Sequence, residues 1–227
     1  MKLWDLDARR ARTTLHGHGQ DSVRSLAFAP DGSLLASASV DTTVKVWDLA
    51  TEQPKYTLKH TGAVMTVAFS SDGKTIASGS DGTALRLWDV GAEKERVTLY
   101  AVRNGYGIVA ATAFAPDGGP VAWGTSLATV NLNDPADGKE LFVLRGHSGN
   151  VFCMAFAPHS GLLASGSSDG TARLWDPTSG QKLTVFKGHD GGVNAVAFSP
   201  DGRTLACGSG EFSTPGVIKL WDVPDGK

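Results

Sequence analysis

The segment Ser165–Asp176 reads SGSSDGTARLWD, and its residue types suit two very different kinds of site. It contains serine, aspartate and tryptophan, and His147 lies 18 residues upstream of Ser165. Serine, histidine and aspartate are the members of a hydrolase triad, in which the histidine takes the serine proton. The same groups can instead form a buried hydrogen-bond chain, because the N–H of a buried tryptophan needs an acceptor. The remainder of the sequence decides between these interpretations.

Variants of this segment recur along the chain with a spacing of 41 to 45 residues. Each unit holds four short apolar runs, rich in Val, Leu, Thr and Phe, between turns that contain Gly, Asp and Pro. Such runs are typical of strands, and Asp-Gly favours a tight hairpin because the turn needs a positive φ. One unit cannot bury both faces of its sheet, so the units are expected to stack around an axis. We therefore predict an all-β chain of four-stranded antiparallel blades arranged as a propeller.

The dipeptides that mark these units resemble the signature of the WD-repeat β-propellers, in which Gly-His, Asp-Gly and Trp-Asp recur in that order. Trp-Asp occurs at 4–5, 47–48, 88–89, 175–176 and 221–222, and Gly-His occurs at 17–18, 146–147 and 188–189. The resemblance covers essentially the whole chain and implies a single WD-repeat propeller domain over residues 1–227 with about five blades. The units are placed approximately at 1–18, which is partial, 19–59, 60–100, 101–144, 145–187 and 188–227.

In this family the His, Ser, Asp and Trp of one unit form a buried hydrogen-bond chain, so the resemblance implies such a structural network here. Two units contain all four members, with ten residues from Ser to Trp and six from Asp to Trp in both. They are His18, Ser37, Asp41 and Trp47 in one unit, and His147, Ser165, Asp169 and Trp175 in the other.

Two further units match the network only in part. One contains His60, Ser78 and Trp88, but Asp81 lies one residue early, which puts its bond with His60 in doubt. The other keeps His189 and Trp221 but has Cys207 in the serine position, and its longer turn has no matching acid, so its network is expected to be broken or completed by water.

The recurrence of this set argues against catalysis. A hydrolase site is normally a single constellation with an exposed nucleophile and an oxyanion hole. Here the set occurs twice in full and twice in part at a structural period, and no GxSxG elbow is present. We therefore interpret these residues as architectural and expect no enzyme activity and no catalytic, cofactor-binding or metal-binding residues.

The unit at 101–144 lacks every member of the network. Trp123 takes the serine position, Leu127 the aspartate position and Asn133 the tryptophan position, while Tyr106 lies near the histidine position. One interpretation is a drifted blade held by apolar packing alone. The alternative is a specialised binding face that presents Arg103 and Tyr106 at the rim, because arginine and tyrosine are favoured at interfaces.

The ends of the sequence determine whether the ring can close. The chain starts in a third strand, MKLWD, continues with an outer strand near residue 13, and ends with a unit of three strands. Pairing of the strand near residue 13 with the last unit would close a five-bladed ring. We expect instead an open or truncated ring, a piece of a longer propeller, because five blades need a larger turn per blade than the seven-bladed rings that these units resemble.

Composition narrows the possible partners. The net charge of −2 and pI of 6.3 supply no basic field for nucleic acid. The sequence contains no apolar run long enough to span a membrane and no signal-like N-terminus, and its two cysteines form no CxxC motif, so we expect a cytoplasmic protein without membrane contact.

The family resemblance implies a non-catalytic scaffold for protein–protein interactions, which binds proteins or peptides at the rim that carries the Asp turns. By position, the candidate contact residues on that rim are Asp21, Val40, Ser80, Asn150 and Ser168, together with Arg103 and Tyr106. The alternative is a regulatory or sensor segment of a larger bacterial signalling enzyme, such as a serine/threonine kinase.

Overall fold

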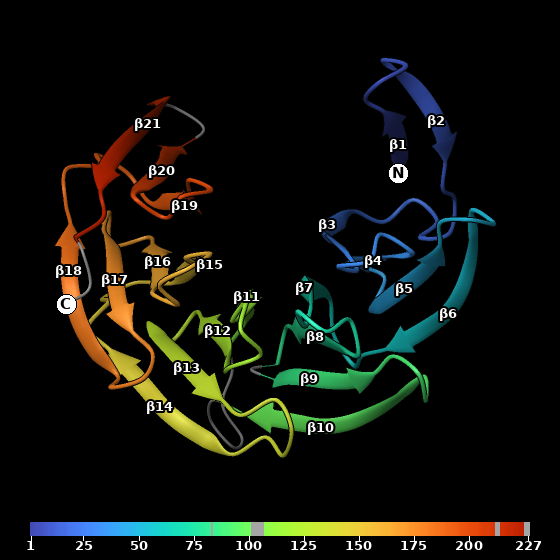
Figure 1. Ribbon diagram of the computed structural model, residues 1–227, viewed down its shortest axis with the longest axis horizontal. Helices are drawn as coiled ribbons and strands as arrows, with labels where there is room; N and C mark the ends of the chain where they lie inside the picture. The colour runs from blue at the N-terminus through green and yellow to red at the C-terminus, as the bar shows by residue number, and fades with distance from the viewer. Residues whose placement is uncertain (83, 101–106, 212–213, 225–227) are drawn as a thin grey trace.

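The computed structural model describes residues 1–82, 84–100, 107–211 and 214–224 of the chain. All 21 elements in these ranges are β-strands, which confirms the all-β prediction (Figure 1). Within the same ranges there is no helix that could cross a membrane.

The strands form six antiparallel sheets, which are named here in chain order. The N-terminal ribbon pairs β1 (Lys2–Asp5) with β2 (Arg10–Thr14). Blade 1 contains β3 (Val23–Phe28), β4 (Leu34–Ser39), β5 (Thr43–Asp48) and β6 (Gln53–Lys59). Blade 2 contains β7 (Val64–Phe69), β8 (Thr75–Ser80), β9 (Ala84–Asp89) and β10 (Lys94–Tyr100). Blade 3 contains β11 (Val109–Phe114), β12 (Val121–Thr125), β13 (Thr129–Asn133) and β14 (Glu140–Arg145).

The remaining two sheets complete the arc. Blade 4 contains β15 (Val151–Phe156), β16 (Leu163–Ser167), β17 (Ala172–Asp176) and β18 (Gln181–Phe186). Blade 5 contains three strands, β19 (Val193–Phe198), β20 (Thr204–Glu211) and β21 (Thr214–Asp222). Each blade therefore runs as a meander, with neighbouring strands in sequence also neighbours in the sheet.

The blades are arranged around a central axis with their first strands innermost and their fourth strands outermost (Figure 1). The ring is open, because the N-terminal ribbon and blade 5 lie on opposite sides of a gap. Strand β2 pairs with β1 and not with β21, so the alternative in which the strand near residue 13 completes the last blade is not observed. The structure thus has the open arrangement that the repeat geometry favours.

Adjacent blades pack through apolar side chains of the third strand of one blade and the first two strands of the next. Val44 and Val46 of β5, for example, share a buried cluster with Val64 of β7. A glycine on the second strand permits a similarly close approach between blades 3 and 4. A Cβ at Gly124 would lie 2.5 Å from Cγ1 of Val151, which is closer than real side-chain contacts allow.

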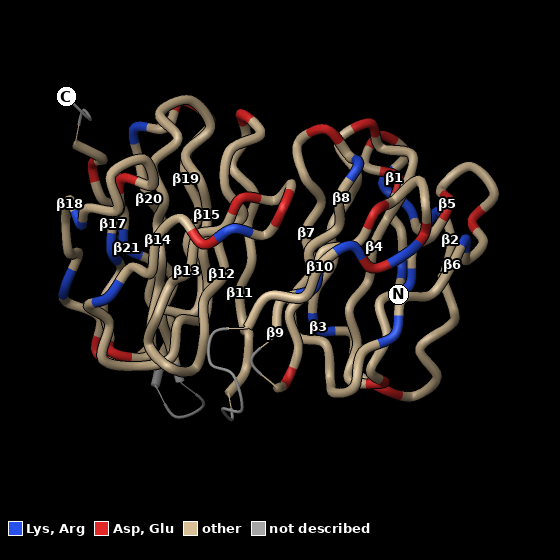
Figure 2. Tube along the Cα trace, turned by 90° about the horizontal axis from the view of Figure 1, so that it is seen from below, with Lys and Arg blue, Asp and Glu red and all other residues tan. Residues whose placement is uncertain are grey.

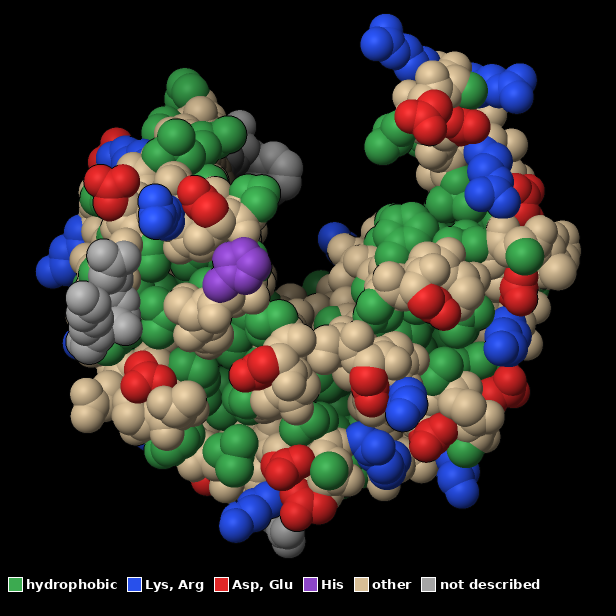
Figure 3. All heavy atoms as spheres, in the orientation of Figure 1, with side chains coloured by type: hydrophobic (Ala, Val, Ile, Leu, Met, Phe, Trp, Pro, Cys, Tyr) green, Lys and Arg blue, Asp and Glu red, His purple; other side chains and the backbone are tan. Residues whose placement is uncertain are grey.

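The two ends of the arc leave apolar strand faces uncovered. On β3, Leu26 and Phe28 are 53% and 59% exposed, and on β21, Ile218 and Leu220 are 76% and 69% exposed. Figure 3 shows hydrophobic side chains gathered over the end of the arc that blade 5 forms. The equivalent positions inside the arc are covered by a neighbouring blade, so the exposure follows directly from the open ring.

Candidate functional site

In blade 4, the four residues singled out by spacing lie in one continuous chain of hydrogen bonds. Trp175 Nε1 donates to Ser165 Oγ over 2.8 Å, and the same oxygen lies 2.8 Å from His147 Nε2. His147 Nδ1 lies 2.9 Å from Asp169 Oδ2. An ionised carboxylate can only accept, so Nδ1 carries the proton and Nε2 accepts from the serine hydroxyl. The chain joins β16, β17 and the segment before β15.

The protonation states agree with this direction of donation. Burial alone would raise the pKa of Asp169, but hydrogen bonds from the Thr171 side chain, the Ser148 N–H and His147 outweigh burial and lower the pKa to about 2. Burial lowers the pKa of His147, and the nearby carboxylate of Asp169 offsets part of that shift. A neutral imidazole and an ionised carboxylate therefore face each other at neutral pH.

Blade 1 contains the same chain. His18 Nδ1 lies 2.7 Å from Asp41 Oδ2, His18 Nε2 lies 2.7 Å from Ser37 Oγ, and Trp47 Nε1 donates to Ser37 Oγ over 2.9 Å. A threonine, Thr43, donates its hydroxyl to Asp41 over 2.6 Å, as Thr171 does to Asp169. The network thus has a fifth member, for which the Asp-x-Thr spacing in both units is the sequence signal.

In blade 2 the chain of hydrogen bonds ends at the histidine and does not reach the aspartate. Trp88 Nε1 donates to Ser78 Oγ over 2.7 Å, and His60 Nε2 lies 2.8 Å from the same oxygen. Among the described residues no hydrogen bond joins Asp81 to His60, and the buried Nδ1 of His60 has no partner. The Asp81 backbone instead forms a β-bridge with Ile108 of the next blade. Burial and, secondarily, the Arg86 charge lower the pKa of His60 to about 4.

In blade 5 the chain of hydrogen bonds is interrupted at the serine position. Cys207 is fully buried there, and within the described residues the buried Trp221 Nε1 and His189 Nε2 have no partner. His189 instead places Nδ1 at 2.6 Å from Ser209 Oγ, two residues further along β20. The network is therefore replaced by a single histidine–serine contact.

Blade 3 has a polar contact of its own, and the interpretation that apolar packing alone holds this blade is wrong. Trp123 Nε1 donates to Asn133 Oδ1 over 2.8 Å, and Asn133 Nδ2 donates to the Gly138 carbonyl over 3.0 Å. In blades 1, 2 and 4 the acceptor is on the second strand and the indole on the third, whereas here the two have exchanged strands. The exposed Leu127 occupies the aspartate position, and Arg103 and Tyr106 lie outside the described residues.

The geometry of these sets suits structural use. The serines of the three blades with a Ser–Trp bond, Ser37, Ser78 and Ser165, are each 0% exposed and accept an indole N–H. A nucleophile needs a path to substrate and a free position beside it for an oxyanion. Across the part of the chain that the structure describes, no group of three or more His, Cys, Asp and Glu could hold a metal ion. The arrangement can tie strands together, and it gives substrate no access to the serine.

The proposed contact residues lie at one rim, where first strands begin and second strands end. Asp21, Asn150 and Ser168 are exposed and Val40 is half-buried. The backbone N–H of Ser168 donates to the Asn150 carbonyl, which brings these two residues side by side. The prediction that Ser80 contacts a partner is wrong, because Ser80 is only 3% exposed. Its strand is buried along its whole length, so a partner on the rim cannot reach this side chain.

The repeat signature is matched in comparisons with known proteins. The family model described as "WD domain, G-beta repeat" matches residues 9–48, 52–89, 138–176 and 180–222, and so omits most of blade 3. The Notchless protein homolog of Arabidopsis thaliana is 50% identical over 50 residues, which are 22% of this chain and 10% of that protein. The small ribosomal subunit protein RACK1y of Oryza sativa subsp. japonica is 40% identical over 65 residues, which are 29% of this chain and 19% of that protein. The matched segments thus span a minor part of these relatives.

Proposed function

Because the chain belongs to the WD-repeat family, we propose that it is a non-catalytic scaffold for protein–protein interactions. The observation that carries this proposal is the burial of the serine and histidine in both complete Ser–His–Asp sets, which leaves surface features such as the rim loops for recognition. Loops held on a rigid scaffold are the usual carriers of recognition. The rim residues Asp21, Val40, Asn150 and Ser168 are the contact surface that we propose.

The charge distribution favours protein partners over nucleic acid or an anionic membrane. Figure 2 shows basic and acidic residues intermixed over the molecule, and the net charge is −2. Binding to a phosphate backbone needs a concentrated basic surface. Two free cysteines, Cys153 and Cys207, suit a reducing compartment, and we propose a cytoplasmic location on that ground.

The alternative function, a sensor segment of a larger signalling kinase, is not favoured by the comparisons. The relatives named above are described as Notchless and ribosomal-subunit proteins and not as kinases. We therefore retain the scaffold as the proposed function.

Affinity capture with rim variants tests the scaffold proposal. We expect Asn150→Arg with Ser168→Arg to lose partners that the wild type retains from cells of the source organism, measured by quantitative mass spectrometry. The matched control is Gln53→Arg with Gln181→Arg, which adds the same charge to the exposed outer strands β6 and β18. Identical capture by both double variants and the wild type would contradict recognition at this rim.

A serine-directed fluorophosphonate probe tests the absence of hydrolase chemistry. We expect no modification of Ser165 in the folded protein, because this side chain is fully buried and accepts the Trp175 N–H. Covalent labelling of Ser165, together with turnover that Ser165→Ala removes, would overturn the architectural assignment.

A further inference from the structure

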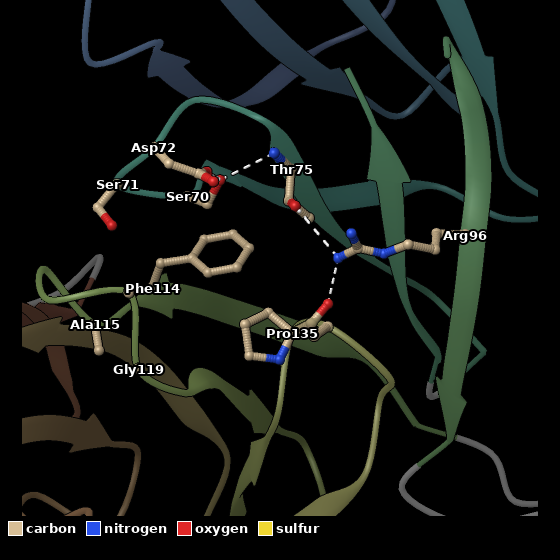
Figure 4. Close-up of a pocket in the computed structure, with 11 residues that line it drawn as sticks. Ser70, Ser71, Asp72, Thr75, Arg96, Phe114, Ala115, Gly119 and Pro135 are labelled. Atoms are coloured by element: carbon tan, nitrogen blue, oxygen red, sulfur yellow. Dashed lines mark hydrogen bonds between the residues drawn. The ribbon is translucent and has the colours of Figure 1, made fainter. Parts of the chain in front are cut away.

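A cleft opens between blades 2 and 3. It lies on the rim opposite the one where first strands begin and second strands end. Its volume is about 250 Å³. The walls come from the β7–β8 turn, the β11–β12 turn, the β13–β14 turn and the side chain of Arg96 on β10 (Figure 4). None of these residues takes part in the buried networks described above.

Two differences from the junction of blades 4 and 5 accompany this cleft. The equivalent position between blades 4 and 5 holds a cavity of about 140 Å³, where Arg203 of the β19–β20 turn contributes to the lining. In blade 3 the position of Arg203 is taken by Gly119, which has no side chain to fill the space. The remaining difference lies on the opposite wall, in the β7–β8 turn.

A proline ring lies close to the neighbouring turn at two of the other three junctions, those of blades 1 and 2 and of blades 4 and 5. Pro30 Cδ lies 3.5 Å from the position that a Cβ would take at Gly73, and Pro158 Cδ lies 3.9 Å from the same position at Gly202. The residue equivalent to these prolines at the junction of blades 2 and 3 is Ser71. At Gly118, the partner glycine, no atom lies within 4 Å of the Cβ position. The space that a proline ring fills at those two junctions is therefore open here.

The lining of the cleft is apolar in the middle and charged at its ends. Figure 4 shows the Phe114 ring between the β7–β8 turn and Pro135, with Arg96 reaching across from β10. Arg96 Nη2 donates to the Pro135 carbonyl and to Thr75 Oγ1, which holds the guanidinium in place. A guanidinium has five N–H donors, so two hydrogen bonds leave donors for a ligand carboxylate.

The turn opposite Arg96 carries the opposite charge. Asp72 Oδ1 accepts from the Ser70 hydroxyl over 2.6 Å and from the Lys74 N–H over 3.0 Å. The Ser70 hydrogen bond first, and then that of Lys74, lower the pKa of Asp72, so its carboxylate is ionised at neutral pH. An acidic ligand group is therefore attracted to the Arg96 end and repelled from the Asp72 end.

We propose that this cleft binds an extended peptide segment of a partner protein, which inserts a proline ring beside Phe114 and directs a neighbouring carboxylate to Arg96. The proline rings at two of the equivalent junctions show that the space between two such turns fits this shape. Aromatic-lined grooves are also the usual sites for proline-containing peptides, whose restricted backbone loses little entropy on binding. This inference rests on the proposed scaffold function and names one class of its partners.

Peptide pools measure this specificity directly. The probes are acetylated, amidated pentapeptides with randomised flanks and either proline or alanine in the centre, passed over the immobilised full chain and identified by mass spectrometry. We expect the wild type to retain the proline pool about tenfold better, with aspartate or glutamate enriched beside the proline. Equal retention of the two pools would overturn the proposal.

Substitutions that introduce the residues found at the junction of blades 4 and 5 locate the binding. Ser71→Pro supplies the missing ring and Gly119→Arg supplies the missing side chain, so each is expected to reduce retention of the proline pool to that of the alanine pool. Thermal unfolding shows whether each variant is folded, and either one alone suffices for the test. Retention at the wild-type level in a folded variant would overturn the proposal.

The role of Arg96 is tested separately. Arg96→Gln is expected to keep the preference for proline and to lose the enrichment of acidic residues. Its matched control is Lys55→Gln, at the equivalent exposed position of β6, which is expected to change neither. Loss of acidic enrichment in the control, or its persistence in Arg96→Gln, would contradict the assignment. The scaffold test uses variants on the opposite rim, so failure here leaves that result unaffected.

Discussion

Blades 4 and 5 share the order of their first three strands, yet only blade 4 contains a complete polar network. Ser165 on β16 joins a tryptophan to a histidine, whereas Cys207 at the same place on β20 joins nothing. Cys207 still packs in the apolar cluster with Leu174 of blade 4. Apolar packing between blades is therefore enough to form the sheet, whereas the network adds stability and fixes the turn that carries the histidine.

Blade 3 contains the same kind of indole hydrogen bond with the two partners on exchanged strands. Its indole is on the second strand and its acceptor on the third, and the hydrogen bond is as short as those in blades 1 and 4. In blades 1 to 4 a buried indole N–H has a side-chain acceptor, and either the second or the third strand can supply it. The chemistry of the pair is retained although the positions are exchanged.

The largest expected effect comes from removing the serine of blade 4. Ser165→Ala leaves both Trp175 Nε1 and His147 Nε2 buried without a partner, so we expect the free energy of unfolding to fall by about 2 to 4 kcal/mol. The matched variant Cys207→Ala removes no hydrogen bond and is expected to cost about 1 kcal/mol for the lost sulfur contact. Urea unfolding measures both, and equal losses would contradict the contrast between the blades.

His60 of blade 2, whose buried Nδ1 has no partner among the described residues, is expected to make the free energy of unfolding depend on pH. The folded pKa of His60 is about 4, below the ordinary histidine value of 6.5, so the unfolded chain binds the proton first as the pH falls. Stability is therefore fully present above pH 6.5 and declines as the pH falls towards 4, by at most about 3 kcal/mol. We expect His60→Gln to flatten this decline and the exposed His159→Gln to leave it unchanged. A steep decline that persists in His60→Gln would show that another group causes it.

The exchanged pair in blade 3 is expected to have a smaller effect. Asn133→Leu removes the acceptor of the Trp123 N–H and the donor to the Gly138 carbonyl, which should lower the free energy of unfolding by about 2 kcal/mol. The exposed Asn150→Leu serves as the control. If Asn133→Leu were as stable as the wild type, apolar packing would suffice for this blade after all.

The smallest expected effect is a gain in blade 5. Cys207→Ser restores the serine that joins tryptophan and histidine in blades 1 and 4. Its hydroxyl is expected to accept from Trp221 Nε1 and donate to His189 Nε2, which should raise the free energy of unfolding by about 1 kcal/mol. A destabilised Cys207→Ser variant would mean that the hydroxyl is buried without its partners. Differential scanning calorimetry of the two proteins distinguishes these results.

The sequence predicts the features that depend on local spacing. Alternating apolar runs and Asp-Gly turns predict the strands and their order, and the regular Ser-to-Trp and Asp-to-Trp intervals single out residues that the structure brings together in blades 1 and 4. The Cys207 and Asp81 deviations also coincide with the places where the networks stop.

Features that depend on contacts between strands are missed by the same reasoning. Comparing residues position by position treats Trp123 and Asn133 as two losses, because it does not show that they face each other. Ser80 is at a rim position in sequence, but the packing of both faces of β8 buries it. The cleft beside Ser71 depends on the distance between two blades, which no single unit specifies.

A double-mutant cycle on Ser165 and Trp175 tests the central claim most directly. Trp175→Phe removes the indole N–H and Ser165→Ala removes its acceptor, so the pair shares one buried hydrogen bond. We expect the two losses in the free energy of unfolding to be non-additive, with a coupling energy of about 1 to 2 kcal/mol. Strictly additive losses would show that this bond does not stabilise the blade, and would contradict the architectural role of the serine.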